Sequence, residues 1–389
     1  MNASSETFIT PPIAFSRPWL GEEEIRAVTE VLQSRWIVGG PKLAEFERRW
    51  AACCGAERAV GVSSWTTGAF LVLHAWGLQP GDEVIVPSLT FIASVNVIVH
   101  AGATPVFAEI DPHTWNIDPE DVARKITPRT RVIMPVDQLG LPCDMDAIHA
   151  LAHPRGIRVL EDAACALGSR NQERPVGSLA EVTVFSLHAR KIVTTGEGGM
   201  IVTNDHVLAD RLTRLRHQGM SLSDFARHQA SPTTFENYPE VGYNARMTDL
   251  QAAIGLGQMD RLEEILKRRR QVAESYRAGL ADLAWLRLPH VPTGMTPNWQ
   301  SFQIGIGPDS LLTRNQWMER LHAAGIPTRR GVMAAHLEPP YRSMNARLPR
   351  TENAADNTLQ LPIHPEMTPE QTARIVTFLR SNGTGNQTP

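Results

Sequence analysis

Short apolar runs alternate with helical patterns through the first half of the chain. The runs are rich in valine, isoleucine and other β-formers and lie at 59–62, 83–87, 104–107, 131–135, 158–161 and 182–186. Among and after them, apolar residues recur at helical spacing at 69–78, 92–101, 145–152 and 207–217. Strands that crossover helices bury on both faces produce this alternation. The pattern therefore predicts an α/β domain with a largely parallel sheet.

The pattern changes on either side of this part of the chain. A polar arm, 1–20, precedes two amphipathic helical stretches at 21–34 and 42–54, and the first has acidic residues in its first turn, which suits the helix dipole. A long helical pattern at 248–280 carries a basic run, 267–270, that we expect to be a solvated helix face. Beyond it lie a predicted strand and two helices, at 301–306, 314–324 and 369–379. We expect a large domain at 21–255, a small C-terminal α+β domain at 256–389 and a frayed tail.

Composition narrows the class of protein. The 389 residues carry a formal net charge of -3, so there is no basic surplus for a nucleic-acid partner. No apolar run is long enough for a membrane span, and the first residues lack the pattern of a secretory signal. The 4 cysteines have no metal-binding spacing and match a reducing compartment. These features predict a cytoplasmic enzyme without a metal, a membrane partner or a nucleic-acid partner.

The segment 185–205 (FSLHARKIVTTGEGGMIVTND) carries the most informative chemistry. A strand ends at Ser186, a short irregular stretch delivers Lys191, and Gly196, Gly198 and Gly199 allow the backbone to turn tightly beside it. A lysine among apolar residues and glycines can lose its solvation and act as a nucleophilic amine, as a Schiff base requires. The alternative is a surface lysine in a glycine-rich loop.

A second candidate follows the apolar strand at 158–161. Asp162 stands at its C-terminal end, and in open α/β sheets ligands bind at that end. A carboxylate there can pair with the pyridine nitrogen of pyridoxal phosphate and keep the ring an electron sink. The alternative is a helix N-cap.

Two further segments follow strand ends. Residues 63–68 (SSWTTG) precede a predicted helix, and their hydroxyls and free N–H groups can form either an anion site or an ordinary cap. In the segment 88–91 (SLTF), Phe91 can lay an aromatic face on a flat ring, or it can pack in the core.

Taken together, the motifs resemble a known family. Five segments occur in order: SSWTTG, PSLTFIAS, EDAACALG, FSLHARKIVTTGEGG and VGYNARMTDLQAAIG. In these segments the chain resembles the DegT/StrS family of pyridoxal-phosphate-dependent, fold-type I sugar aminotransferases. The resemblance covers nearly the whole chain. It implies a large domain with a mainly parallel central sheet flanked by helices, and a smaller C-terminal α+β domain.

The resemblance also implies roles for individual residues. Lys191 would be the Schiff-base lysine, and Asp162 would pair with the pyridine nitrogen. Phe91 would stack on the ring. The phosphate would be held by three hydroxyl side chains and by an asparagine that reaches into the neighbouring subunit's site: Thr66, Thr67, Ser186 and Asn244. That asparagine implies a homodimer with shared active sites.

Three positions depart from the family pattern. Cys165 stands near the phenolic oxygen of the ring, where glutamine or histidine is usual, and it is a weaker hydrogen-bonding group. Trp65 replaces glycine or alanine before the phosphate-binding threonine, so it either fills a core gap or narrows the pocket. Ala245 stands where tyrosine is common, which opens space near the dimer contact. These departures bear on which substrate is accepted.

Three more residues are candidates for substrate contacts. His188 lies three positions before the lysine and can be a general base or shape the pocket. Arg329 and Arg330 can meet a carboxylate or a sugar phosphate.

We therefore expect an aminotransferase that moves an amino group from glutamate or glutamine to a keto sugar, linked to a nucleotide, in amino-sugar or natural-product biosynthesis. One alternative is an aminotransferase for a cyclitol or another natural-product ketone. The other is a regulatory protein that binds pyridoxal phosphate without turnover.

Overall fold

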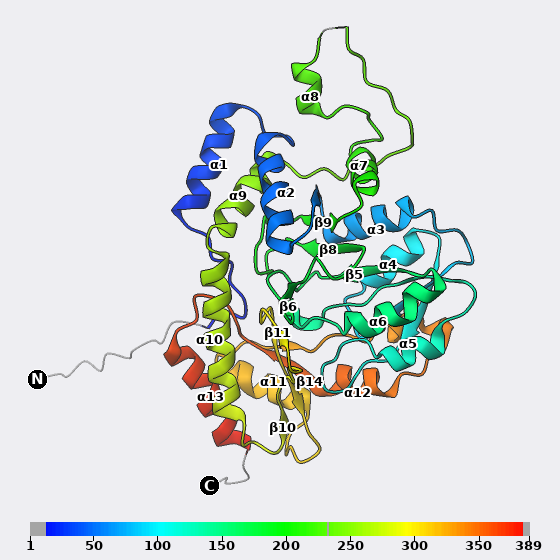
Figure 1. Ribbon diagram of the computed structural model, residues 1–389. Helices are drawn as coiled ribbons and strands as arrows, with labels where there is room; N and C mark the ends of the chain where they lie inside the picture. Colours follow the sequence, from blue (N-terminus) through cyan, green and yellow to red (C-terminus); the bar gives the residue numbers. More distant parts are fainter. Residues whose placement is uncertain (1–12, 232, 384–389) are drawn as a thin grey trace, which may run out of the picture.

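A seven-stranded sheet forms the centre of the larger part of the molecule in the computed structural model, which describes residues 13–231 and 233–383 (Figure 1). Its strand order is β1-β9-β8-β5-β4-β2-β3. The strands are β1 (Arg58–Val62), β2 (Glu83–Pro87), β3 (Thr104–Ala108), β4 (Thr130–Ile133), β5 (Arg158–Asp162), β8 (Val182–Ser186) and β9 (Gly199–Thr203). Neighbours pair in parallel except for β9, which is antiparallel to β1 and β8. The predicted α/β fold with a mainly parallel sheet is confirmed.

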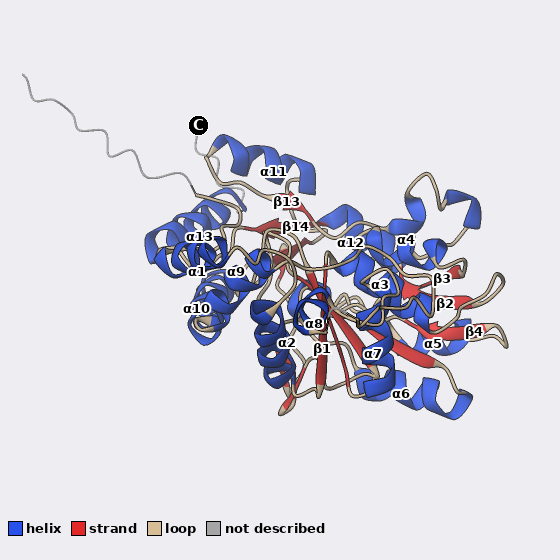
Figure 2. Ribbon diagram, turned by 90° about the horizontal axis from the view of Figure 1, so that it is seen from above, coloured by secondary structure: helices blue, strands red, loops and turns tan. Residues whose placement is uncertain are grey.

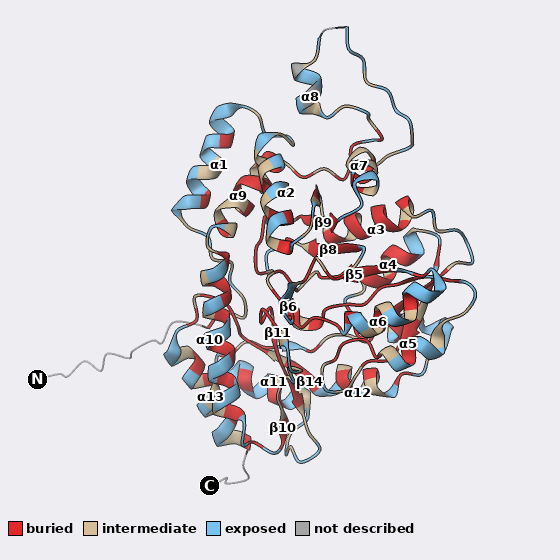
Figure 3. Cartoon of the chain, viewed as in Figure 1, coloured by how far each residue is buried: buried red, intermediate tan, exposed pale blue. Residues whose placement is uncertain are grey.

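Helices cover both faces of this sheet (Figure 2). Along β2, Val84 and Val86 face a core formed with α3 (Trp65–Ala75), α4 (Ala93–His100) and α7 (His206–Leu215). Ile85 faces a second core formed with α2 (Pro41–Cys54), α5 (Pro119–Lys125) and α6 (Met145–Ala152). Burial on both faces explains why the strands are continuous apolar runs rather than alternating ones (Figure 3).

Two peripheral helices leave apolar surface exposed. Helix α1 (Glu22–Ser34) packs against α9 (Asp249–Met259), and α8 (Asp224–Gln229) projects from the body of the molecule (Figure 1). Of the predicted arm, 1–20, residues 1–12 lie outside the described part, as do residues 384–389 of the predicted tail.

A four-stranded antiparallel sheet organises the C-terminal region, residues 283–383. Its order is β10-β12-β14-β13, with β10 (Leu286–Arg287), β12 (Phe302–Ile306), β14 (Thr358–Leu361) and β13 (Arg329–Arg330). The helices of this part are α11 (Arg314–Ala323), α12 (Pro349–Asn357) and α13 (Pro369–Gly383), and α10 (Leu262–Leu280) packs against α13. Trp285 and Trp317 stack in its core, with ring centroids 4.6 Å apart.

The described residues also form a small sheet and four short 3-10 turns. The order β11-β6-β7 joins β11 (Met295–Thr296) to β6 (Arg170–Asn171) and β7 (Arg174–Pro175). The turns are η1 (Gln138–Gly140), η2 (His153–Arg155), η3 (Ala335–Leu337) and η4 (Arg342–Met344). None of the helices in the described residues has both the length and the apolar character that crossing a membrane requires.

The long helical pattern at 248–280 was expected to be continuous, but the structure divides it into α9 and α10 at Asp260 and Arg261. The expectation of a solvated basic face is also wrong at Arg269, which is buried at 2% exposure. Its guanidinium donates to the carbonyls of Trp299 and Ile363, so it ties α10 to the loops of the C-terminal region.

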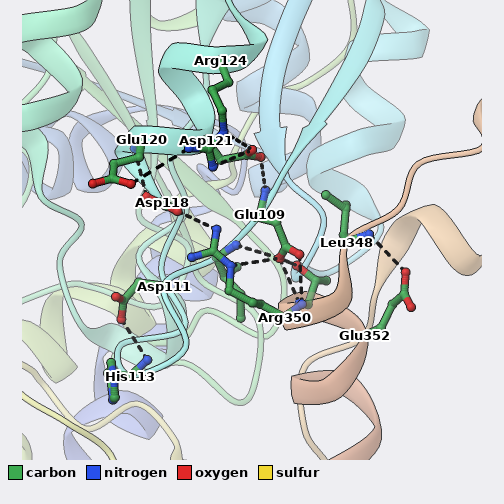
Figure 4. A network of polar contacts seen from close by, with 12 residues as sticks. Glu109, Asp111, His113, Asp118, Glu120, Asp121, Arg124, Leu348, Arg350 and Glu352 are labelled. Atoms are coloured by element: carbon green, nitrogen blue, oxygen red, sulfur yellow. Dashed lines mark hydrogen bonds and ion pairs between the residues drawn. The ribbon is translucent and has the colours of Figure 1, made fainter.

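Helix α12 anchors the C-terminal region to the central sheet. The buried Glu109, just after β3, accepts hydrogen bonds from the backbone N–H groups of Arg350 and Thr351 in the first turn of α12 (Figure 4). The Arg350 guanidinium contacts Asp118 at 2.6 Å. A carboxylate at a helix N-terminus satisfies free N–H groups and complements the helix dipole, so this contact fixes the position of α12.

Candidate active site

A cavity of about 680 Å³ lies between the carboxyl ends of the central strands and the C-terminal region. From the first half of the chain it is lined by Phe15, Ser16, Ser64, Trp65, Thr66, Thr90, Phe91, Ala93, Ser94, Val136, Asp137, Gln138, Leu139, Asp162, Ala164, Cys165, Ser186, His188, Arg190 and Lys191. Residues from further along the chain complete it: Glu197, Gln300, Ser301, Arg329, Arg330, Gly331, Val332, Met333, Gln360, Leu361 and Ile363. Parallel α/β sheets place ligand sites at this end of their strands.

Lys191 reaches the cavity from the loop between β8 and β9. Thr195 N–H donates to the Leu187 carbonyl at 3.0 Å, which closes the loop behind the lysine, and Gly196 has a φ of 82°. The Lys191 Nζ donates to the Cys165 Sγ at 3.0 Å. The lysine is therefore held at the cavity wall and is not a free surface side chain.

Asp162 ends β5 and lies almost completely buried, at 2% exposure. Its Oδ2 accepts from the Ser94 hydroxyl at 2.7 Å, and its Oδ1 accepts from the Ala164 N–H at 3.1 Å. Burial raises the pKa of Asp162 to about 6, although both hydrogen bonds and the Lys191 charge act in the opposite direction. No helix starts within the next turn of chain, which argues against the helix-cap alternative.

Two more carboxyl groups lie buried behind Asp162. Glu161 points to the opposite face of β5 and accepts from Thr183 Oγ1 at 2.7 Å, while Asp137 accepts from the Cys143 N–H at 2.9 Å. Burial raises the pKa of Glu161 to about 7, and burial together with the Glu161 charge raises the pKa of Asp137 well above its usual value. The raised pKa values favour the protonated forms of these two carboxyl groups, which limits the negative charge beside Asp162.

The N-terminus of α3 forms another part of the wall. Ser64 and Thr66 line the cavity, but the Thr67 hydroxyl faces away from it and donates to the Ser64 carbonyl at 2.9 Å, as part of a capping box. A Cβ on Gly199 would lie 2.5 Å from the Ser64 carbonyl carbon, so only glycine lets β9 approach this turn.

Trp65 does both things that the sequence allowed: it fills space in the core, and it narrows the pocket. Its ring packs in the core with 6% exposure, and its Nε1 donates to the Val184 carbonyl at 3.1 Å. It also contributes to the cavity lining. Ala245, another departure, is buried in the same core.

The aromatic and hydroxyl candidates are also brought to the cavity. Phe91 is 69% exposed, which excludes the core-packing alternative and leaves a ring face available to a ligand. Ser186 is half-buried at the end of β8. His188 lies 3.9 Å from Glu197, and partial burial lowers the pKa of His188, which favours its neutral imidazole.

Three arginines line the cavity, and two of them lie on the wall that the C-terminal region forms. Arg329 and Arg330 come from β13, and Arg190 comes from the lysine loop. Arg329 stacks over Phe15 with its guanidinium carbon 5.3 Å from the ring centroid. The side chains of Arg190 and Arg330 form no hydrogen bond or ion pair with any residue in the described ranges. Sequence reasoning missed Arg190, although its place directly before Lys191 is a usable signal.

Ser94 was also missed as a functional residue, although it closes the PSLTFIAS motif. Asn244, in contrast, is not brought to the cavity of its own chain. It is exposed, and it forms an isolated backbone bridge with His217. Over residues 13–231 and 233–383, no cluster of histidine, cysteine or acidic side chains could hold a metal ion.

Comparisons with known proteins agree with this geometry. The model of the DegT/DnrJ/EryC1/StrS aminotransferase family matches residues 18–380. The chain is 40% identical to the GDP-perosamine synthase of Caulobacter vibrioides, over 95% of this chain and 98% of the relative. It is 38% identical to the spore coat polysaccharide biosynthesis protein SpsC of Bacillus subtilis, over 95% and 96% of the two chains. A crystal structure of DesI, determined in the presence of its TDP-sugar product, superposes with a TM-score of 0.87 at 35% identity, over 96% of this chain and 93% of that one.

Proposed function

Because the chain belongs to the DegT/DnrJ/EryC1/StrS aminotransferase family and is a pyridoxal 5'-phosphate-dependent aminotransferase, we propose that it moves an amino group from glutamate or glutamine to a keto sugar linked to a nucleotide. One observation carries the proposal: a single cavity has Lys191 and Asp162 on one wall and Arg329 and Arg330 on the other, with Arg190 beside the lysine. The first wall suits amine chemistry, and the second suits an anionic substrate.

The residues of this chain fit the cofactor. The buried Asp162 carboxylate suits a protonated pyridine nitrogen, and the exposed ring of Phe91 suits a stacked aromatic ring. The first turn of α3, with Thr66, and the hydroxyl of Ser186 suit a phosphate. Thr67 supports this turn rather than offering a free donor, because its hydroxyl donates to the Ser64 carbonyl and its N–H donates to Ser64 Oγ in the capping box. When bound, pyridoxal phosphate supplies an aldehyde that joins to amines and a ring that accepts the electron pair of a broken C–H bond.

Each catalytic side chain has one task in this proposal. In the donor half-reaction, Lys191 Nζ takes the proton from the carbon that bears the amino group, as a general base. In the acceptor half-reaction, it gives a proton to the carbon of the former ketone, as a general acid. Asp162 holds the proton on the pyridine nitrogen, and Ser94 orients the Asp162 carboxylate. Cys165, in contact with Lys191 Nζ, orients the amine. His188, beside Glu197, shapes the entrance.

The arginines support a nucleotide-linked acceptor. A guanidinium binds phosphate oxygens with two parallel hydrogen bonds, so free arginines at a cavity suit a diphosphate. Arg190 and Arg330 are exposed and have no partner among the described residues, and their charge is therefore available. The GDP- and TDP-linked sugars in the names of two relatives agree with this chemistry.

We further propose a homodimer in which Asn244 reaches the phosphate site of the neighbouring subunit. Its exposure and its absence from the cavity of its own chain support this role. The preceding segment exposes three large apolar side chains, Phe235, Tyr238 and Val241, at 83%, 56% and 83%. Clustered exposed apolar side chains of this kind mark interaction surfaces. The 4 free cysteines suit the reducing cytoplasm as the place of action.

Two half-reactions test the acceptor. Glutamate or glutamine should convert the cofactor to its amino form, which is followed by absorbance. A 4-keto or 3-keto nucleotide sugar should convert it back, and the same keto sugar without its nucleotide should do so more slowly. If simple 2-oxo acids react far faster than every sugar ketone, the chain is a general amino-acid aminotransferase. If a cyclitol ketone reacts fastest, the nucleotide-linked acceptor is wrong.

A further inference from the structure

A row of three polar side chains, of which Ser88 and His336 are buried and Glu352 is partly exposed, lies at the contact between the central sheet and the C-terminal region. Ser88 Oγ lies 2.7 Å from His336 Nδ1, and His336 Nε2 lies 3.2 Å from Glu352 Oε1. Ser88 follows β2, His336 lies in η3, and Glu352 lies in α12, so the row joins segments far apart in the chain.

The order of residues resembles a hydrolytic triad, but burial excludes that chemistry. Ser88 has 0% exposure, His336 has 3% exposure, and neither lines the cavity. A nucleophilic hydroxyl must reach its substrate, and this one cannot. The row therefore has a different task.

The hydrogen bonds assign the tautomer of the imidazole. Ser88 Oγ accepts from the backbone N–H of His336 at 3.0 Å. Its own proton then needs an acceptor, and within the described residues His336 Nδ1 is the only one in reach. Nδ1 therefore accepts, and the ring proton sits on Nε2, where it donates to Glu352. Every group in the row is satisfied in this arrangement alone.

Segments on both walls of the cavity are hydrogen-bonded next to this row. Ala335 N–H donates to the Ser88 carbonyl at 2.7 Å, and Thr90 N–H contacts the Met333 carbonyl at 3.2 Å. Thr90 and Met333 both line the cavity. On one side, the Thr90 hydroxyl lies 2.9 Å from Ser94 Oγ, which in turn holds Asp162. On the other side, the chain that contains Met333 continues from the arginines of β13.

The outer end of the row is itself fixed. The Leu348 N–H donates to Glu352 Oε1 at 3.1 Å, and Glu109 holds the first turn of α12 (Figure 4). The carboxylate that orients His336 therefore belongs to a helix anchored on the central sheet. This gives the imidazole a rigid support instead of a mobile side chain.

We propose that His336 is a positioning residue of the aminotransferase site: held by Glu352, it fixes Ser88 and so sets the spacing between the Thr90–Phe91 loop and the Val332–Met333 wall. The proposal rests on this cavity being the aminotransferase site and does not depend on which ketone is the acceptor. Loss of the imidazole should let the two walls separate while each keeps its own side chains.

Amide hydrogen exchange of the holoenzyme tests the spacing directly. In His336→Ala, exchange of the Thr90 and Ala335 amides should become at least tenfold faster. His336→Asn, whose amide oxygen can still accept from Ser88, should recover most of the protection, whereas His336→Gln should not. The control is Leu379→Ala, which opens a cavity in the core of the C-terminal region far from the row. At an equal loss of Tm it should leave both amides protected.

Kinetics supply the second readout. His336→Ala should raise KM for the acceptor about tenfold and weaken the binding of pyridoxal phosphate, with a smaller change in kcat. Unchanged exchange at Thr90 and Ala335, or equal changes in Leu379→Ala, would overturn the proposal. If His336→Ala does not fold, Ser88→Ala tests the same bond and should give the same pattern. A failure of the acceptor assignment alone would leave the exchange result intact.

Discussion

The two walls of the cavity differ in what holds their charged side chains. On the sheet side, Asp137 and Asp162 line the cavity with exposures of 1% and 2%, and Glu161, at 0%, lies on the opposite face of β5. All three carboxyl groups accept hydrogen bonds from hydroxyl or N–H groups. The arginines of the cavity, Arg329 and Arg330 on the other side and Arg190 in the lysine loop, are exposed. Two of these have no partner within the described residues. Folding fixes the first wall, while the second wall is left for a ligand to order.

This difference assigns separate duties to the walls. Ionising a buried carboxyl group is unfavourable unless a cation or a protonated ring binds beside it. The wall that contains Asp162, here called the carboxylate wall, therefore suits one kind of ligand. An exposed arginine contributes little to the free energy of folding, so it can be substituted without disturbing the fold. We therefore expect changes in the first wall to abolish the reaction and changes in the second to alter the choice of substrate.

The largest effect is expected at Lys191. Lys191→Ala removes the amine that moves the proton, so kcat should fall by about 10⁴ or more, since general acid–base transfer alone contributes about 10²–10⁴. Single-turnover absorbance measures the rate in each half-reaction. Thr195→Ser, which keeps the loop contacts beside the lysine, should stay near wild type. Turnover of Lys191→Ala within tenfold of wild type would assign the amine role to another residue.

Asp162→Ala should lose less, about 10²–10³ in kcat, because the electrostatic support of the ring is removed while the lysine stays. Circular dichroism should show an intact fold. Ser94→Ala, which removes only the hydroxyl that orients the carboxylate, should cost about tenfold. If Asp162→Ala kept near-wild-type turnover, the carboxylate wall would be structural only.

Subunit mixing tests the shared site. Asn244→Asp should repel the cofactor phosphate and inactivate the dimer, and Lys191→Ala should be inactive by itself. A random mixture of the two should regain up to about a quarter of wild-type activity, because half of the dimers are mixed and each has one intact site. Native mass spectrometry confirms that subunits exchange. No recovery despite exchange would place Asn244 outside the neighbouring site.

The arginine wall should give smaller and more selective losses. Arg190→Ala, Arg329→Ala and Arg330→Ala should each raise KM for the nucleotide-linked acceptor about tenfold, near 1.4 kcal/mol, with kcat and the donor half-reaction little changed. Added salt should weaken acceptor binding in the wild type more than in the variants. Arg320→Ala, an exposed arginine of α11 away from the cavity, is the matched control. A change in kcat alone would mean that these arginines act in the chemistry.

The smallest effect concerns stability without cofactor. The folded-state pKa of Asp162, about 6, lies above the 3.8 of an unperturbed aspartate, so its stabilising contribution is full below pH 4 and is lost as pH rises through 6. At pH 8, the free energy of unfolding of Asp162→Asn should therefore exceed that of wild type by up to about 3 kcal/mol, so the variant should unfold at a higher denaturant concentration. At pH 4 the two proteins should differ little. Arg190→Ala should show no such pH dependence. If Asp162→Asn and wild type were equally stable at pH 8, the buried carboxylate would not destabilise the fold, and the two walls would not differ in this respect.

The sequence predicted the central sheet well, because burial on both faces leaves continuous apolar runs. Strand β9, in contrast, was not predicted, since its residues follow a glycine-rich loop that gave no separate signal. The break between α9 and α10 was missed because the apolar spacing continues across Asp260 and Arg261. Arg269 was misplaced because a run of basic residues does not indicate which member points inward.

The candidate site could be predicted only in part. Lys191, Asp162 and Phe91 stand at strand ends or in a loop with a clear local pattern, and all three line the cavity. The row from Ser88 to Glu352 depends on a contact between Ser88 and His336, which lie 248 residues apart in the sequence. The carboxyl pair beside Asp162 depends on the neighbouring placement of β5 and the segment that follows β4. No local pattern reports either contact. Arg190 matters only because β13 brings two more arginines opposite it.

The central claim is that Lys191 carries the cofactor in this cavity, and reduction with borohydride tests it most directly. The yellow holoenzyme is reduced, digested and mapped by mass spectrometry. The account predicts that the pyridoxyl label lies on Lys191 alone and that Lys191→Ala is unlabelled. Label on another lysine, or a wild-type protein that takes up no cofactor when pyridoxal phosphate is supplied, would contradict the account.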